Sequence, residues 1–268
     1  MNNDEIFKRF DTMRNGRGVW ESHWEEIAER CLPRSAEFVG EREQGDKRTE
    51  KLYDATAALA LERFAAAVES LLTPRGARWH TLRSSNIELN KDDEVRAWFD
   101  QVEQAMFSHR YSPKANFAGQ IHEGYMSMGA FGTAATFVDE SPVRGCVYRA
   151  CHLADVFIAE NEHGLVDTVF RKFEVSARQA LRMFADGDLS DDLRKAANDK
   201  PDSKVKLLHV VMPRSDRDPT RRDRKNAKWF GGYFEMKTKN MIEEGGFDTM
   251  PYIISRYVRA VSSNDGFA

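Results

Sequence analysis

The chain has 268 residues, 41% of them apolar and 31% charged, with 40 lysine and arginine residues against 43 aspartate and glutamate residues, which gives a net charge of −3. This composition supplies enough apolar side chains for a core and excludes intrinsic disorder as the default state. The near balance of charge excludes a surface that is cationic throughout, which extensive nucleic-acid binding would require. The length fits one large unit, which we expect to consist of two layers.

The sequence carries no signal for a membrane or for secretion. No stretch approaches the roughly 18–20 apolar residues that span a bilayer, and the N-terminal residues are acidic where a signal peptide is basic. The three cysteines, Cys31, Cys146 and Cys151, are an odd number in a large domain, which indicates reduced thiols rather than a disulfide framework. We therefore expect a soluble chain in a cytoplasmic environment, without a membrane partner.

The N-terminal segment is predicted to be helical. In residues 4–32 apolar side chains recur at mostly three- and four-residue intervals, and Pro33 ends the pattern. The sequence Gly16-Arg17-Gly18 could interrupt this helix. Residues 34–50 are rich in charge and glycine and lack periodicity, so they are predicted to form an exposed, mobile loop.

Three further helices are predicted before residue 133. They span residues 52–72, 92–109 and a segment that begins near 112 or 116 and ends at the glycines 129 and 132. The helix at 92–109 is amphipathic, and its apolar residues include Trp98 and Met106. Between the first two of these helices, residues 78–83 have a short extended character.

From Thr133 onward the pattern changes to strands. Short runs rich in valine, phenylalanine and threonine alternate with turn signals, which predicts an antiparallel β-meander. Strands are expected at residues 133–138, 147–150, 156–159, 166–173, 205–212, 229–236 and 251–258, and short helices with serine N-caps at 176–184 and 190–198. The predicted fold class is α+β, with about four helices in residues 1–132 followed by a β-rich part in residues 133–268.

The sequence predicts a protein without enzymatic activity and without a cofactor. The glycine-rich and catalytic motifs of nucleotide binding and hydrolysis are absent from it. The one Cys/His cluster, Cys146, Cys151 and His152, offers fewer than the four ligands of a structural zinc site. The seven histidines are scattered, and none falls in a recognisable triad. We therefore assign no catalytic, cofactor-binding or metal-binding residue.

Two carboxylate clusters leave a magnesium-dependent alternative open. Asp186, Asp188 and Asp191 could hold Mg²⁺ and act as a nuclease on DNA, although acidic residues before a helix are also explained by its N-terminal dipole. Glu243 and Glu244 precede two glycines and are interpreted as a plain turn.

A basic loop is expected between the strands at 205–212 and 229–236. Residues 214–228 contain seven basic and three acidic residues, a local excess of four positive charges in a chain of net charge −3. Such a loop could contact DNA phosphates or an acidic face of a partner, or it could be a solvated hairpin tip, and a simple DNA-binding module would use Arg221, Arg222, Arg224 and Lys225. The candidate contact residues are Arg214, Arg217, Arg221, Arg222, Arg224, Lys225 and Lys228.

Short motifs spread along nearly the whole chain resemble, in their joint order, the head-to-tail connector or portal proteins of short-tailed (podovirus, T7-like) bacteriophages. No single motif is decisive, but their order is specific. The motifs lie at residues 20–24 with Leu32-Pro33, 53–57 with 65–66 and 71–74, 78–82, 128–135, 160–164 with 166–167, 245–247 and 251–257.

The resemblance implies a function that composition does not show. It implies a structural subunit of a dodecameric ring at one vertex of the capsid, through which double-stranded DNA enters during packaging and leaves at infection. It also implies docking of terminase and later of tail adaptor proteins, assembly with scaffold and major capsid proteins in the host cytoplasm, and a place in the virion. The near-neutral charge is compatible with a channel through which DNA slides.

One departure from the family pattern concerns the end of the sequence. In the family, the segment that matches residues 251–257 usually continues through a Gly-Glu-x-Tyr-Gly-Arg-like sequence into a long second half, which residues 261–268 do not resemble. The resemblance therefore implies an N-terminal half, chiefly the peripheral wing. Residues 1–132 are then expected to be its helical part and residues 133–268 its β-rich part, with most of the stem, clip and crown absent.

Overall fold

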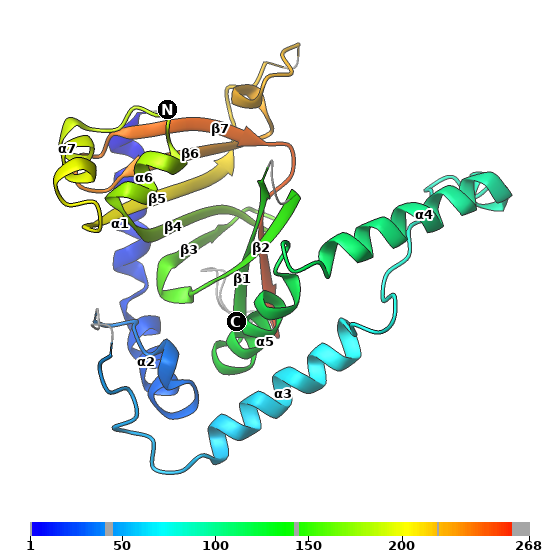
Figure 1. The fold of residues 1–268 in the computed structure, drawn as a ribbon, viewed down its shortest axis with the longest axis horizontal. Coiled ribbons are helices and arrows are strands. Elements are labelled where there is room, and N and C mark those ends of the chain that lie inside the picture. The colour runs from blue at the N-terminus through cyan, green and yellow to red at the C-terminus, as the bar shows by residue number, and fades with distance from the viewer. Residues whose placement is uncertain (1, 41–44, 142–144, 219, 259–268) are drawn as a thin grey trace.

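The computed structural model describes residues 2–40, 45–141, 145–218 and 220–258, and its α+β architecture confirms the predicted fold class (Figure 1). The helices are α1 (Asn3–Gly16), α2 (Gly18–Cys31), α3 (Thr56–Leu72), α4 (Asp93–Arg110), α5 (Phe117–Phe131), α6 (Ala177–Met183) and α7 (Asp191–Asp199). The strands are β1 (Thr133–Ser141), β2 (Gly145–Cys151), β3 (Val156–Glu160), β4 (Val166–Ser176), β5 (Lys204–Pro213), β6 (Trp229–Glu235), β7 (Met241–Phe247) and β8 (Tyr252–Arg256). Short 3-10 turns are η1 (Pro33–Ser35), η2 (Leu89–Lys91), η3 (Leu153–Asp155) and η4 (Arg224–Asn226).

The N-terminal segment forms two helices that meet at Arg17. A capping box of Asn2 and Glu5 starts α1, and the chain turns at Arg17 before α2 begins. The buried Arg17 guanidinium donates hydrogen bonds to the carbonyls of Leu153 (2.9 Å), Ala154 (2.8 Å) and Val156. The interruption left open in the sequence is therefore real, and a continuous helix over residues 4–32 is wrong, because the backbone bends to bring this side chain to η3.

The segment after α2 is only partly the exposed loop that the sequence predicts. Ala36 is fully buried and Phe38 is 6% exposed. Phe38 packs against the rings of Trp24 (5.5 Å between centroids) and Phe131 (5.1 Å), so the chain here covers the core instead of leaving it. Residues 41–44 of the predicted loop lie outside the described residues.

The predicted strands form two antiparallel sheets. The five-stranded sheet has the order β3-β4-β5-β6-β7, in which each strand pairs with its neighbour in sequence, as in the predicted meander. The three-stranded sheet has the order β2-β1-β8, so the last strand returns to pair with the first. The predicted turn at Glu243 and Glu244 is wrong: both residues lie in β7, where Gly245 and Gly246 pair with β6.

The glycine at position 246 explains why β7 resembles a turn in the sequence. A Cβ at Gly246 would lie 2.5 Å from the carbonyl oxygen of Arg224 and 2.7 Å from that of Trp229. Glycine is therefore required by the close approach of η4 and β6, and not by a turn.

Helices cover both faces of the five-stranded sheet. Ile6, Phe7 and Phe10 of α1 pack on one face together with Phe170 and Leu208. On the other face, α6 and α7 enclose a smaller cluster with β5 and β7, whose buried members are Ala180, Phe184, Leu189, Leu193, Leu207 and Ile242. The three-stranded sheet joins α2 and α5 in the largest cluster, which includes Trp24, Phe131 and Phe137.

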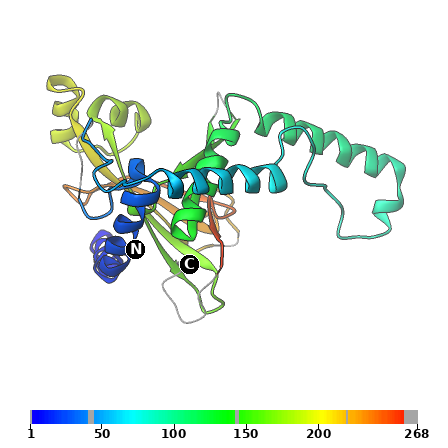
Figure 2. The same ribbon diagram turned by 90° about the horizontal axis from the view of Figure 1, so that it is seen from below.

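The segment from residue 74 to residue 116 forms an arm that leaves this body, and α4 is its main element (Figures 1 and 2). Residues 78–83, predicted as extended, form no strand in the described chain and run beside α4. No helix among the described residues is long and apolar enough to span a bilayer. The arm and the β5–β6 loop are the two features that project furthest in Figure 1.

Candidate functional site

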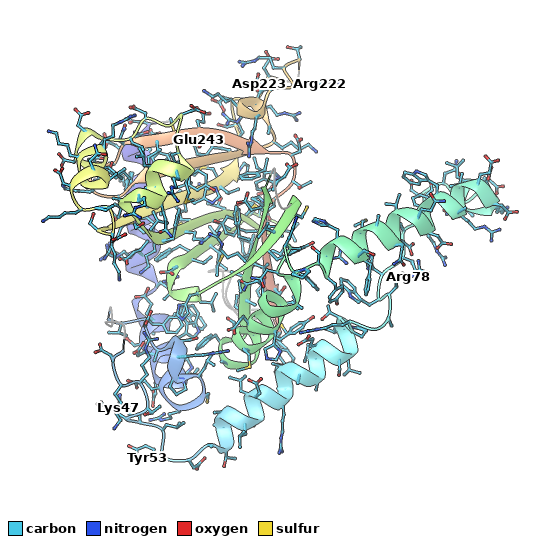
Figure 3. The ribbon with its side chains drawn as sticks, viewed as in Figure 1. Lys47, Tyr53, Arg78, Arg222, Asp223 and Glu243 are labelled. Carbon is cyan, nitrogen blue, oxygen red and sulfur yellow. The ribbon has the colours of Figure 1, made fainter. Side chains whose placement is uncertain are left out.

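The basic loop joins the ends of β5 and β6 and lies at the top of Figure 3, where Arg222 and Asp223 are labelled. β5 ends at Pro213 and β6 begins at Trp229, so the loop has the predicted limits of residues 214–228. Of these, Pro219 lies outside the described residues. The short turn η4 gives the second half of the loop its shape.

Arg214 anchors the loop and contributes little free charge to it. Its side chain is 8% exposed, forms an ion pair with Glu244 (2.9 Å) and donates a hydrogen bond to the carbonyl of Gly245 (3.1 Å). Its guanidinium also lies 5.3 Å from the centroid of the Phe230 ring. These contacts tie the base of the loop to β7, so a contact with an external molecule has to rest on the other six basic residues.

Asn226 organises the interior of the loop. Its side chain accepts a hydrogen bond from the amide of Asp218 (2.9 Å) and donates one to the carbonyl of Arg221 (2.8 Å). The backbone carbonyl of Asn226 accepts a hydrogen bond from the side chain of Arg217 (3.3 Å). Asn226 is only 6% exposed, although most residues around it in the loop are charged. Sequence reasoning missed it, because a single asparagine in a basic run carries no pattern.

The remaining basic residues present their charge outward. Arg221 pairs with Asp223 (2.7 Å between Nη2 and Oδ2), and both side chains remain largely exposed. Arg222, Arg224, Lys225 and Lys228 are exposed and form no ion pair with any described residue. The loop is therefore a locally cationic surface held by Arg214 and Asn226, and it is chemically suited to phosphates or carboxylates of another molecule.

The carboxylates proposed for magnesium do not converge. Ser190 caps α7, and Asp191 lies in its first turn, as the capping explanation requires. Asp188 lies near the side-chain amide of Asn240 (3.5 Å), and Asp186 is exposed. No group of three or more potential metal ligands occurs among the described residues. This placement gives no support to the nuclease alternative.

The basic loop and these aspartates lie toward opposite ends of β7. The amide of Asp188 donates a hydrogen bond to the carbonyl of Ile242 near the start of that strand (2.8 Å), whereas Arg224 of the loop approaches Gly246 near its end. The predicted cysteine cluster is likewise dispersed. Cys151 is buried, and burial raises the pKa of its thiol, while Cys146 is exposed at the other end of β2.

A buried polar cluster in the core was not predicted. His209 of β5 is 1% exposed, its Nδ1 lies 2.7 Å from the Tyr252 hydroxyl, and its ring stacks on Tyr233 at 4.2 Å between centroids. Burial, together with the nearby positive charge of Arg171, lowers the pKa of His209 to about 3. The imidazole is thus neutral at physiological pH and joins the two sheets through Tyr252.

The arm exposes apolar side chains that a soluble helix would normally bury. On α4, Trp98 is 58% exposed and Met106 is 40% exposed, and Glu103 is the buried residue of that helix. Glu103 accepts a hydrogen bond from the backbone amide of Leu82 and forms an ion pair with Arg78 (3.4 Å). Arg78 is labelled beside α4 in Figure 3. The amphipathic pattern predicted for this helix is present, but the chain itself does not cover Trp98.

α3 also exposes apolar side chains. Leu59 is 56% exposed, Leu71 is 79% exposed and Leu72 is 59% exposed, while Leu61 and Ala65 face α5.

The model of the family described as bacteriophage head to tail connecting protein matches residues 3–265. The chain is similar to the probable portal protein of Bordetella phage BPP-1, with 31% identity over 245 residues, 90% of this chain and 44% of that protein. It is also similar to the portal protein of Salmonella phage epsilon15, with 25% identity over 272 residues, 99% of this chain and 48% of that protein. The chain therefore spans about half the length of these relatives.

Proposed function

The chain belongs to the bacteriophage head-to-tail connecting protein family, as its ordered motifs predicted, and we propose that it acts as a structural subunit of the phage portal. The observation that carries this proposal is the family match over residues 3–265. The names of the two relatives support it, since both are described as portal proteins. On this proposal the protein is a virion component and catalyses no reaction.

We place the described fold in the peripheral wing of such a portal. On this proposal, residues 1–132 form its helical part and residues 133–268 its β-rich part, and most of the stem, clip and crown lies outside these residues. The subunits assemble into a dodecameric ring at one capsid vertex. Assembly takes place in the host cytoplasm together with terminase, scaffold and major capsid proteins, and tail adaptor proteins bind later. The exposed apolar side chains of α3 and α4 support assembly, because contacts between proteins bury such side chains.

The ring encloses double-stranded DNA without gripping it. The net charge of −3 supports this, because each phosphate neutralised by a fixed cation would hold the DNA in place. The basic loop, with Arg217, Arg221, Arg222, Arg224, Lys225 and Lys228 exposed and Arg214 at its base, is the surface on which DNA or an acidic partner is contacted.

Labelling of phage particles tests the function. Gold-labelled antibodies against this chain should bind at a single capsid vertex in electron micrographs, with antibodies against the major capsid protein as the control that decorates every face. Particles with label spread over all vertices, or with none, would contradict a portal role.

Two biochemical measurements test the remaining parts. Incubation of the chain with DNA and Mg²⁺ or Mn²⁺ should give no cleavage, and cleavage that is lost in Asp188→Ala would instead establish the nuclease.

The second measurement compares the DNA affinity of the wild type with that of a double variant that carries Arg222→Gln and Lys225→Gln. At about 50 mM salt the two affinities should differ if the loop contacts phosphates. Equal affinities would remove DNA as the ligand of the loop.

A further inference from the structure

The exposed face of α4 is the most conspicuous surface that the chain leaves uncovered. The helix has 18 residues and is about 27 Å long, yet Glu103 alone among its residues is buried. The Trp98 indole packs against the neighbouring Phe99 ring (5.1 Å between centroids) and remains 58% exposed. Tryptophan in such a position is typical of the centre of a protein interface, because its large surface gains most when water is excluded.

The outer half of the arm is acidic. Residues 84–104 contain six acidic and two basic residues, an excess of four negative charges. The two basic residues are already paired within the arm, Lys91 with Glu88 (2.8 Å) and Arg96 with Asp93. Glu94 precedes Trp98 by four residues and therefore lies on the same face of the helix. An arginine placed over the indole could thus also reach a carboxylate.

The basic loop has a net charge of opposite sign to that of the arm. Residues 220–228 contain five basic residues and Asp223, an excess of four positive charges. Arg222 and Lys225 are exposed there and form no ion pair with a described residue. The guanidinium of arginine both stacks on aromatic faces and pairs with carboxylates. The loop therefore carries the cationic groups that complement the indole and the carboxylates of α4.

The two surfaces do not meet within one copy of the chain. In Figure 1 the arm extends to the right of the body, whereas the loop rises above the five-stranded sheet, and no hydrogen bond or ion pair between described residues joins the two. Contact between the two requires a second copy. A contact between different surfaces of identical chains repeats from each copy to the next, and it closes into a ring when the rotation allows.

We propose that the face of α4 around Trp98 and Glu94 docks onto the basic loop, around Arg222 and Lys225, of a second copy of this chain. This inference rests on the proposed function and names the partner of the basic loop. The arm is then the element that reaches the neighbouring subunit. Charge complementarity steers the approach, and burial of the indole stabilises the contact.

Charge reversal on each side tests the contact. The loop variant carries Arg221→Glu, Arg222→Glu and Lys225→Glu, and the arm variant carries Glu88→Lys, Glu94→Lys and Asp100→Lys. Each variant alone should associate at least about tenfold more weakly than the wild type in sedimentation velocity at about 50 mM salt, because like charges then face each other. A body variant with Asp11→Lys, Asp186→Lys and Asp199→Lys carries the same change of charge as the arm variant on other exposed residues, and it should associate as the wild type does.

Mixing the two variants is the decisive step. In an equimolar mixture the reversed loop faces the reversed arm and the native loop faces the native arm, so association should return to the wild-type level. Rescue on mixing excludes DNA or a different protein as the reason for the charges, since neither is present. Circular dichroism should show that all variants are folded.

Each failure has a distinct meaning. A mixture that stays as weak as its components, or an arm variant that associates like the wild type, overturns the arm-to-loop contact. If particles still carry the chain at one vertex, the portal function survives that result. If the loop variant loses DNA binding and the arm variant behaves as the wild type in every assay, DNA is the ligand of the loop and the inference is wrong.

Discussion

The five-stranded sheet and the α4 arm differ in how much of their apolar surface the chain itself covers. β5 directs Leu207 and Leu208 to opposite faces of the sheet, and each is fully buried, one against α6 and α7 and the other against α1. Trp98 on the arm has a larger side chain and is 58% exposed. The stability of the single chain therefore resides in the sheet and its helices, whereas the arm is available for contacts between molecules.

The largest effect should follow from a cavity in the sheet. Phe170→Ala removes a fully buried ring that contacts Phe10 of α1 (6.0 Å between centroids), and it should lower the free energy of unfolding by about 3–5 kcal/mol. Urea denaturation measures the change. A loss below about 1 kcal/mol would show that the α1 contact does not stabilise the sheet.

The second largest effect should come from the bend between α1 and α2. Arg17→Ala leaves three buried carbonyls without their donor and Glu21 without its ion pair, and it should cost about 3 kcal/mol of stability. Arg30→Ala is the matched control, because its ion pair with Glu26 is exposed and should contribute less than about 1 kcal/mol. Equal losses in both variants would contradict a structural role for the Arg17 contacts.

A graded effect, absent at neutral pH, should appear on acidification through His209. Its pKa is lowered to about 3 in the folded chain and is about 6.5 in the unfolded chain, so below pH 6.5 only the unfolded state takes up the proton. Stability should therefore fall as pH decreases from 6.5 towards 3, with a contribution from His209 of about 1.4 kcal/mol per pH unit. The difference in this slope between the wild type and His209→Gln isolates the contribution. Identical slopes would mean that folding does not lower the pKa of His209.

The smallest effect on stability should come from the arm. Trp98→Ala removes a side chain that the chain leaves mostly exposed, and the free energy of unfolding should change by no more than about 0.5 kcal/mol. Thermal unfolding of the monomer checks this value. A loss comparable to that of Phe170→Ala would erase the distinction between the two regions.

The sequence predicts the local elements well and the long-range contacts poorly. The helix at 93–110 and the strands on either side of the basic loop follow from periodicity and lie within one or two residues of their predicted limits. β7 is missed because Gly245 and Gly246 have the composition of a turn, and the close approach of Arg224 that requires Gly246 joins distant residues.

The same limit applies to the candidate site. The charge of residues 214–228 is visible in the sequence, but the burial of Arg214 depends on Glu244 and Gly245, which lie 30 residues further along. The exposure of Trp98 was also beyond prediction. An amphipathic pattern predicts an apolar face, and it does not tell whether the same chain or another one covers that face.

We propose above all that the arm serves assembly and not the stability of the chain. Native mass spectrometry of the wild type and of Trp98→Ala, at equal concentration and after both are shown to be folded, tests this role directly. We expect multi-subunit species for the wild type and monomers for Trp98→Ala. The same distribution of species for both chains, or monomers alone for the wild type, would contradict it.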